Sequence, residues 1–347
     1  MKQIKLVDEK SLEMEETKKP IIKDDEVLIE VEVCGICGSD VHSYKGEHPF
    51  VSPPIVLGHE YTGIVKEVGN NVTRNINIGD RVTSELVINC GECYNCRHGR
   101  YQICKNGKHL GNVNKDGAMA EFVKMKSDKI HVLPDNMVPY EGAMVEPTAV
   151  GVHAIRRSNF KLGDTALVIG AGVIGNLTAQ LLKKAGAQKV IIAEIVDERL
   201  KKAKDVGIKD VVNTKNIDLV KWIDENLEDE QLDVVFDCAG TKTTLNLAIE
   251  VARKGSQIIL MGVPSENIPV NMAYVQDREL EIIGTLQYVR EDFERAINFI
   301  SDKSVDVKTL ITDFYFFSNF QSAFDDVLDP KKIENGLIKA MLKINVE

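Results

Sequence analysis

The stretch "TALVIGAGVIGN", Thr165–Asn176, joins a short apolar run to three glycines and to the start of a helical pattern. Gly170, Gly172 and Gly175 form a G-x-G-x-x-G motif. The first glycine of such a motif permits a tight turn, the second lets a phosphate approach the backbone, and the third lets the helix pack closely on the strand. The free N–H groups at the helix start would then face an anion. The stretch therefore predicts a strand, a phosphate-binding turn and a helix.

The sequence around this stretch repeats the strand-and-helix pattern. Further apolar runs at 189–194, 233–240, 256–263 and 280–286 alternate with helical patterns such as 197–207 and 243–255. Buried strands that alternate with amphipathic helices imply a doubly wound parallel sheet. In the helix after the motif, one face carries Ile174, Leu177, Leu181 and Leu182.

An acidic residue, Glu194, ends the strand that follows, nineteen residues after Gly175. A carboxylate at this position can accept hydrogen bonds from the adenosine ribose of a dinucleotide. The alternative is an ordinary solvated strand end. Because strand, turn, helix and acid occur together, we predict a dinucleotide-binding domain. NAD is expected in preference to NADP, since a 2′-phosphate beside Glu194 would bring like charges together, although Arg199 could turn toward a phosphate.

Four of the seven cysteines lie within fifteen residues, as C-x2-C-x2-C-x7-C. Four thiolates this close suit a tetrahedral Zn²⁺ with no open position, which is a structural site. An iron–sulfur cluster is the main rival, and buried or disulfide-bonded cysteines are a further alternative. The predicted zinc lobe spans about 88–106, with the ligands Cys90, Cys93, Cys96 and Cys104.

Length, charge and hydropathy limit the possible classes. A chain of 347 residues is expected to form about two domains. A net charge of −10 argues against a nucleic-acid-binding surface. The N-terminal "MKQIKLVDEKSLEMEE" lacks the apolar centre of a secretory signal, and no stretch approaches eighteen uncharged apolar residues. We therefore expect a cytoplasmic protein without a membrane span.

The segment "VEVCGICGSDVH", Val31–His42, holds a second pair of cysteines, Cys34 and Cys37. Such a pair can be a redox couple, half of a zinc site, or one working cysteine beside a bystander. A catalytic zinc needs three protein ligands and an open position. Cys37 can supply one ligand, and His59, Glu60 and Glu146 are further candidates, although each alone has a commoner structural explanation.

The order of these motifs carries a resemblance. "GICGSDVH", "LGHEYTG", the four-cysteine lobe, "EPTAVGVHA" and "GAGVIG" follow one another as in zinc-dependent medium-chain dehydrogenases. Across the whole chain, the sequence resembles the polyol branch, typified by sorbitol (L-iditol) dehydrogenase. The resemblance implies a GroES-like, β-rich catalytic domain at 1–150, a Rossmann NAD-binding domain at 151–287, and a C-terminal segment at 288–347 that returns to the catalytic domain. It also implies a homo-dimer or homo-tetramer.

The resemblance also implies roles for single residues. Cys37 and His59 match catalytic zinc ligands, Glu60 matches a ligand or exchanging ligand, and Glu146 stands where alcohol dehydrogenases have cysteine. With the four-cysteine site, two Zn²⁺ per chain are expected. Ser39 and His42 match a proton relay, whereas Cys34 matches nothing catalytic and is expected in the core. Cofactor contacts are expected at Val173, Ile174, Arg199, Val263 and Leu286, and substrate contacts at Tyr44, Glu146, Gln287 and Tyr288.

The implied activity is hydride transfer between a secondary alcohol of a sorbitol-, iditol- or xylitol-like polyol and NAD. In the family resemblance, sorbitol dehydrogenases have an Arg-Tyr pair where this chain has Gln287-Tyr288. This difference puts sorbitol itself in doubt as the substrate. The intact zinc lobe also resembles that of 2,3-butanediol and threonine 3-dehydrogenases, which remain alternatives. A non-catalytic zinc- and nucleotide-binding sensor is an alternative of a different class.

Overall fold

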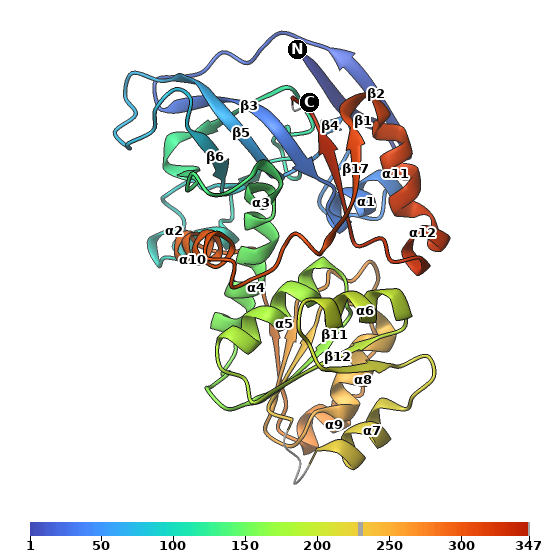
Figure 1. The fold of residues 1–347 in the computed structure, drawn as a ribbon. Helices are drawn as coiled ribbons and strands as arrows, with labels where there is room; N and C mark the ends of the chain where they lie inside the picture. Colours follow the sequence, from blue (N-terminus) through green and yellow to red (C-terminus); the bar gives the residue numbers. More distant parts are fainter. Residues whose placement is uncertain (228–231, 346–347) are drawn as a thin grey trace.

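The computed structural model describes residues 1–227 and 232–345, which form two lobes. Figure 1 shows a β-rich lobe that carries both termini and a second lobe built on a parallel sheet. Helix α4 (Val145–Arg157) runs from the first lobe to the second. The residues predicted to hold the catalytic zinc, in the first lobe, and those predicted to bind the cofactor, in the second, can therefore meet only where the lobes face each other.

The second lobe contains a six-stranded sheet with the order β13-β12-β11-β14-β15-β16, and every neighbouring pair is parallel. This is the dinucleotide-binding topology, in which the strand order reverses between β11 and β14. The predicted fold class is therefore confirmed. The strands are β11 (Thr165–Ile169), β12 (Lys189–Glu194), β13 (Asp210–Asn213), β14 (Val234–Asp237), β15 (Gln257–Leu260) and β16 (Glu281–Gly284).

Strand β13 was not predicted from the sequence. It has four residues, and only Val212 is fully buried, so its apolar signal is short. Parallel pairing with β12 nevertheless fixes it at one edge of the sheet. Its strand conformation follows from pairing with β12 and could not be predicted from the four residues themselves.

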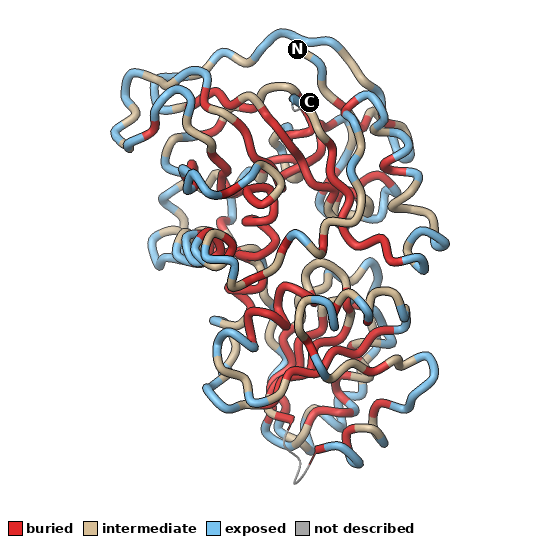
Figure 2. Tube along the Cα trace, viewed as in Figure 1, coloured by how far each residue is buried: buried red, intermediate tan, exposed pale blue. Residues whose placement is uncertain are grey.

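Helices cover both faces of this sheet (Figure 1), and the strands lie buried between them (Figure 2). Successive strand residues point to opposite faces. Leu167 packs in one apolar cluster with residues of α7 and α8, while Val168 packs in another with residues of α5 and α6. The helices are α5 (Val173–Lys184), α6 (Asp197–Asp205), α7 (Leu219–Asn226), α8 (Lys242–Val251) and α9 (Met272–Asp277).

The β-rich lobe is built around a seven-stranded sheet with the order β10-β6-β5-β3-β18-β17, and β9 also pairs with β3. A three-stranded sheet, β2-β1-β4, and the pair β7-β8 complete it. The strands are β1 (Lys2–Asp8), β2 (Ser11–Glu16), β3 (Glu26–Gly35), β4 (Ile55–Val56), β5 (Glu60–Val68), β6 (Arg81–Ser84), β7 (Val87–Ile88), β8 (Lys108–His109), β9 (Phe122–Lys126), β10 (Ile130–Val132), β17 (Ile311–Phe316) and β18 (Lys339–Lys343).

The last strand of the chain lies beside its third strand. β18 pairs antiparallel with β3, where Met341 faces Gly35 and Leu342 faces Cys34. Met341 and Leu342 are fully buried, so apolar burial stabilises this return of the chain. The domain boundaries at 150 and 287 stay predictions. Helices of this lobe and of the tail are α1 (Gly38–Lys45), α2 (Tyr94–Arg97), α3 (Pro139–Ala143), α10 (Arg290–Ser301), α11 (Phe320–Leu328) and α12 (Pro330–Glu334).

Helix α10 is held against α4 by a buried carboxylate. Asp292 accepts a hydrogen bond from His153 Nδ1 at 2.7 Å and one from Arg156 Nη1 at 2.5 Å. Burial by itself would raise the pKa of Asp292, but the bonds from His153, the Val289 N–H and Arg156 outweigh it and hold the pKa below its ordinary value. The contact fixes the start of the C-terminal segment on the helix that joins the lobes.

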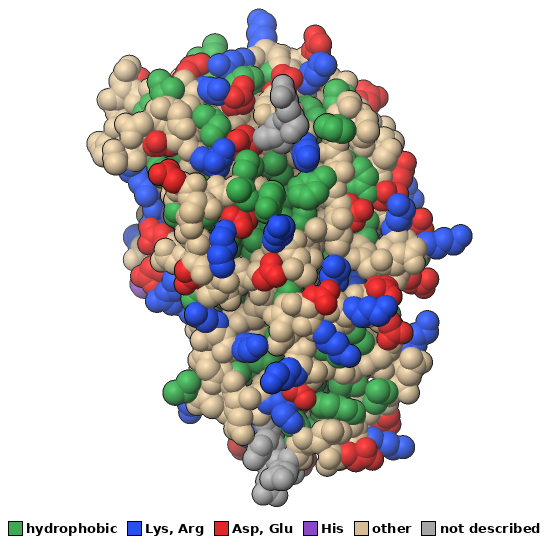
Figure 3. Space-filling view, viewed as in Figure 1, with side chains coloured by type: hydrophobic (Ala, Val, Ile, Leu, Met, Phe, Trp, Pro, Cys, Tyr) green, Lys and Arg blue, Asp and Glu red, His purple; other side chains and the backbone are tan. Residues whose placement is uncertain are grey.

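The surface is of mixed charge. In Figure 3, Lys and Arg side chains lie interspersed with Asp and Glu side chains over the face shown. Within residues 1–227 and 232–345, no helix has the length and hydropathy needed to cross a membrane.

Candidate active site and zinc centres

A cavity of about 330 Å³ lies where the two lobes meet. Its wall in the β-rich lobe includes Cys37, Ser39 and His59. Its wall in the other lobe is formed by residues that directly follow β14, β15 and β16, together with Ile174 at the start of α5. The carboxyl ends of the strands at the point of reversal are where open parallel sheets bind ligands.

Three of the predicted catalytic zinc ligands meet at this wall. Cys37 precedes α1, and His59 directly precedes Glu60, the first residue of β5. Their ligand atoms all lie within 4.8 Å of one another. His59 Nδ1 is buried and has no hydrogen-bond partner among the described residues. One thiol, one imidazole and one carboxylate form a donor set that suits Zn²⁺ and leaves a position open, so the residues present fit the metal.

A second carboxylate, Asp40, organises this ligand set. Asp40 is 1% exposed, and it accepts hydrogen bonds from the N–H of Cys37 at 2.9 Å and of Gly58 at 3.1 Å. Its Oδ1 lies 3.8 Å from His59 Nδ1. Partners of this kind orient metal ligands. Asp40 is not among the predicted site residues, although an acid three residues after a helix cap is the signature of a capping box.

A buried lysine from the end of the chain holds Glu60. Lys339 Nζ donates to the Glu60 carboxylate and to the Ile36 carbonyl, the latter at 3.0 Å. Both side chains of the ion pair are 2% exposed. Burial lowers the pKa of Lys339, but the negative charges of Glu60 and Cys37 outweigh it, and the pKa is raised. Lys339 is not among the predicted site residues, because 279 residues separate it from Glu60.

Glu146 lies on the same cavity wall but outside the group formed by Cys37, His59 and Glu60. Burial raises the pKa of Glu146 to about 7, and the nearby charge of His59 counteracts this in part. A carboxyl group whose pKa lies near neutral pH can be protonated or ionised beside the metal position. Its role as a zinc ligand stays a prediction.

The two predicted relay residues both line the cavity. His42 continues from Ser39 along α1, and its Nδ1 lies 3.2 Å from Glu47 Oε2. The side chains of His42 and Glu47 are 42% and 45% exposed, so this pair reaches solvent. Glu47, His48 and Asn112 also line the cavity and were not predicted from the sequence.

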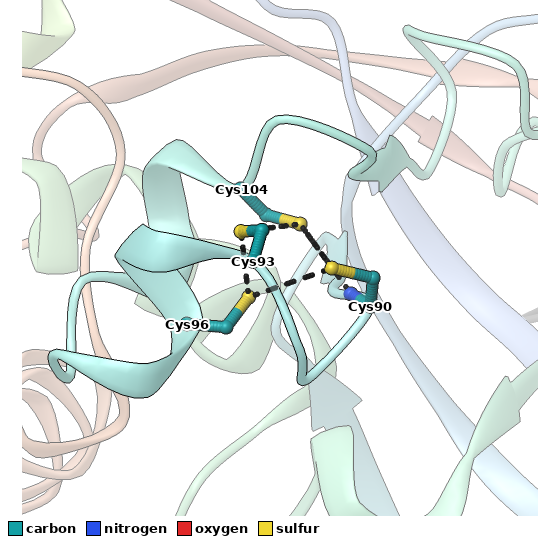
Figure 4. A group of neighbouring side chains, drawn as sticks. All are labelled: Cys90, Cys93, Cys96 and Cys104. Atoms are coloured by element: carbon teal, nitrogen blue, oxygen red, sulfur yellow. Dashed lines mark hydrogen bonds between the residues drawn. The ribbon is translucent and has the colours of Figure 1, made fainter.

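The side chains of the four predicted structural zinc ligands lie close together in the segment around α2 of the β-rich lobe (Figure 4). The sulfur atoms of Cys93 and Cys96 lie 3.5 Å apart, those of Cys90 and Cys104 3.5 Å, and those of Cys90 and Cys96 4.0 Å. Four sulfurs around a Zn²⁺ at about 2.3 Å would be separated by roughly 3.8 Å. Backbone N–H groups, first that of Cys96, lower the pKa of Cys93 to about 6, which favours the thiolate that a metal needs. The cluster fits a closed zinc site.

The glycine motif has the geometry that a dinucleotide needs. Gly170 has a φ of 101°, in the left-handed region. A Cβ on Gly175 would lie 1.8 Å from the Gly170 carbonyl oxygen, so only glycine permits this packing of helix on strand. Gly172 caps α5, and a Cβ there would meet nothing within 4 Å, which leaves open space for a phosphate. Val173 is the first residue of α5.

Glu194 lies beside this turn. Its Oε2 accepts from the Ala171 N–H at 2.8 Å, and its Oε1 accepts from the Ile195 N–H at 2.7 Å. Arg199 Nη1 is 3.9 Å from Glu194 Oε2, and its Nη2 is 3.5 Å from the Leu337 carbonyl. The carboxylate is therefore fixed at the edge of the nucleotide turn. Of the remaining predicted cofactor residues, Ile174, Val263 and Leu286 line the cavity.

The predicted substrate residues occupy different places. Gln287 and Glu146 line the cavity. Tyr44 is 8% exposed and packs its ring 5.5 Å from that of Phe324, and it is not among the residues that line the cavity. Tyr288 lies behind the wall, where its hydroxyl accepts from the Leu86 N–H at 3.3 Å. The two tyrosines thus support the site from the core. Cys34 is fully buried, as expected.

Comparisons with known proteins agree with this geometry. The profile of the alcohol dehydrogenase GroES-like domain matches residues 23–135, and that of the zinc-binding dehydrogenases matches residues 173–302. A sorbitol dehydrogenase of Bacillus subtilis is 33% identical over 340 residues, covering 97% of this chain and 95% of that protein. A D-arabitol-phosphate dehydrogenase of Enterococcus avium is 36% identical over 333 residues, covering 94% and 92%.

Solved structures show the same arrangement. A zinc-binding dehydrogenase from Sinorhizobium meliloti bound to NADP superimposes with a TM-score of 0.90 at 30% identity, over 99% of this chain and 98% of the other. An alcohol dehydrogenase from E. coli CFT073 complexed with NADH has the same TM-score and identity over 99% of both chains. The similarity spans both lobes and both cysteine-containing motifs, so the chain belongs to the polyol branch of the zinc-dependent medium-chain dehydrogenases, as an oxidoreductase that acts on CH–OH groups.

Proposed function

We propose that the protein transfers hydride between a secondary hydroxyl-bearing carbon of a sorbitol-, iditol- or xylitol-like polyol and NAD. The observation that carries this proposal is the shared cavity. The Cys37, His59 and Glu60 donor group faces the carboxyl ends of the nucleotide-binding sheet across one space of about 330 Å³. An alcohol held at the first wall would thus meet a nicotinamide held at the second.

In this proposal Cys37, His59 and Glu60 hold the catalytic Zn²⁺, with Glu146 as a further ligand or near-ligand, and the four clustered cysteines hold the structural one. The chemistry that the catalytic ion supplies when bound is polarisation of the alcohol oxygen, which lowers the pKa of the hydroxyl. Asp40 keeps Cys37 and His59 in position. The facing loops exclude water, and hydride transfer itself belongs to the cofactor.

The proton of the alcohol leaves through side chains of α1 in this proposal. The Ser39 hydroxyl accepts it while its own proton passes on toward His42. Because His42 is half-exposed and hydrogen-bonded to Glu47, the proton can continue to solvent. Histidine suits this transfer, since its ordinary pKa lies near neutrality.

NAD is the proposed cofactor, since Glu194 is fixed by backbone N–H groups where the adenosine ribose hydroxyls would lie. The solved relatives include complexes of both cofactors, one with NADP and one with NADH. We further propose a cytoplasmic homo-dimer or homo-tetramer. Strand β16 is the last strand of its sheet among the described residues, which leaves its outer backbone groups open for pairing.

The experiment that tests the function is reduced-cofactor absorbance on zinc-loaded protein. The panel contains sorbitol, xylitol, 2,3-butanediol and threonine, each with NAD and with NADP. Turnover of a pentitol or hexitol with NAD supports the proposal. Preference for 2,3-butanediol or threonine assigns one of the other dehydrogenase activities. Absence of turnover on every alcohol despite bound zinc would favour the non-catalytic sensor.

A further inference from the structure

We infer that Glu85 is a positioning residue for the active-site wall, and that Tyr101 ties it to the four-cysteine lobe. The inference rests on the proposed function, because it concerns the wall at which the alcohol is proposed to bind. Glu85 directly follows β6 and is 1% exposed. A carboxylate that is buried this deeply needs several donors around it.

Both oxygen atoms of the Glu85 carboxylate have partners. Oε2 accepts a hydrogen bond from the Tyr101 hydroxyl at 2.6 Å. Oε1 accepts one from His131 Nε2 at 3.1 Å and lies 3.2 Å from Arg290 Nη2. Burial alone would raise the pKa of Glu85, but the bond from His131, the charge of Lys129 and the bond from Tyr101 outweigh it and lower the pKa. The ionised carboxylate thus joins three separate segments: the four-cysteine lobe, β10 and the start of α10.

Tyr101 belongs to the four-cysteine lobe and makes two bonds through one hydroxyl. It begins the short helical turn Tyr101–Ile103, and its carbonyl accepts from the Cys104 N–H at 3.0 Å. Its hydroxyl donates to Glu85 and accepts from the Arg290 N–H. A hydroxyl that donates and accepts at once is fixed in direction. A displacement of the cysteine-bearing segment would therefore move this hydroxyl away from the carboxylate.

The residue after Glu85 connects this network to the cavity. Leu86 lines the cavity, and its N–H donates to the Tyr288 hydroxyl at 3.3 Å. Tyr288 stands two residues before Arg290, so Glu85 and Leu86 hold the same segment by neighbouring contacts. Gln287, at the start of that segment, also lines the cavity. Because a misplacement of about 1 Å can lower catalysis strongly, an anchor behind the wall can affect turnover without touching the substrate.

The first test is a comparison of two tyrosine variants on zinc-loaded protein. Tyr101→Phe removes the hydroxyl and keeps the ring and all four cysteines. The KM for the best polyol of the panel should rise roughly 3- to 10-fold. The KM for NAD should stay unchanged, since none of these contacts involves the glycine turn. The matched control is Tyr94→Phe on α2 of the same lobe, where the residue is 67% exposed, and it should change neither value.

A second variant acts on the carboxylate itself. Glu85→Gln keeps the shape but removes the charge and turns one acceptor into a donor that faces other donors. Its polyol KM should rise at least as much as that of Tyr101→Phe, again without a change in the KM for NAD. A purely structural role would give a different result, because loss of folded protein lowers kcat and leaves both KM values unchanged.

The second readout needs no substrate. Nuclear magnetic resonance of isotope-labelled leucine methyl groups reports the surroundings of Leu86, whose signal is identified by its loss in Leu86→Met. The Leu86 resonance should shift in Tyr101→Phe and stay in place in Tyr94→Phe. Cys93→Ser, which removes a ligand of the four-cysteine lobe, should shift it as well.

The two readouts separate this inference from the proposed function. A raised polyol KM together with a shifted Leu86 resonance in Tyr101→Phe supports the inference. An unchanged resonance in Tyr101→Phe overturns it, and so does an unchanged polyol KM in that variant. If the wild type turns over no polyol, the proposed function fails, and the Leu86 resonance in Tyr101→Phe then decides the inference alone.

Discussion

Replacing Lys339 by methionine should destabilise the β-rich lobe strongly, because it leaves the Glu60 carboxylate buried without its cation. Both members of the ion pair are 2% exposed, so water cannot replace the lost ammonium. At an effective dielectric of about 20, two unit charges in contact attract one another by on the order of 5 kcal/mol. Breaking a buried pair by removing one member typically costs about 3–5 kcal/mol. The Ile36 carbonyl also loses its bond from Nζ.

Thermal unfolding of the wild type and of Lys339→Met, followed by circular dichroism, measures this effect. At about 2–4 °C per kcal/mol for a domain of this size, the midpoint should fall by roughly 6–20 °C. Lys343→Met is the matched control on the same strand. The Lys343 ammonium lies 5.4 Å from the Phe314 ring centroid near the surface, so its loss should shift the midpoint by less than about 2 °C.

The double variant Lys339→Met with Glu60→Gln removes both charges and should recover part of the lost stability. Urea unfolding of the four proteins of this cycle gives the coupling free energy, which we expect to be at least about 2 kcal/mol. A Lys339→Met midpoint within about 2 °C of the wild type, or a coupling free energy near zero, would show that the pair does not stabilise the fold as argued.

Three further predictions concern the metals, the cofactor and acid stability. Metal analysis should find two zinc ions per chain, and a single zinc ion in the wild type would contradict the two-site assignment. Cys93→Ser should lose one zinc ion and unfold at a lower temperature. Cys37→Ser should abolish turnover with little effect on the unfolding temperature. The wild type should prefer NAD to NADP by at least about tenfold in kcat/KM, and Glu194→Ser should reduce that ratio; equal wild-type values would exclude Glu194 as the selector. The lowered pKa of Asp292 contributes stability that is present above its ordinary pKa of about 4 and is lost as the pH falls through the lowered value. At pH 7 the free energy of unfolding of Asp292→Asn should therefore be about 3 kcal/mol lower than that of the wild type. This difference should shrink toward pH 2, and urea titrations at each pH measure it.

The sequence alone determined the features whose physical cause lies within one short segment. The glycine turn at Gly170–Gly175 depends on the conformational freedom and small size of three neighbouring residues, and its geometry is as predicted. The four-cysteine cluster depends on ligand spacing within one loop, and its sulfur atoms meet. The parallel sheet was evident from alternating apolar runs, except for β13, whose four residues carry too little apolar signal of their own.

Only the tertiary structure decided which distant residues meet. Lys339 reaches Glu60 because β18 pairs with β3, and Gln287 meets His109 although 178 residues separate them. The sequence placed Tyr44 with the substrate residues; its ring packs 5.5 Å from that of Phe324, and its role as a substrate contact stays a prediction. Such contacts depend on strand pairing and on burial over the whole lobe. The free energies of strand pairing and burial are summed over many residues. The local sequence around Lys339, Tyr44 or Gln287 therefore does not predict these contacts.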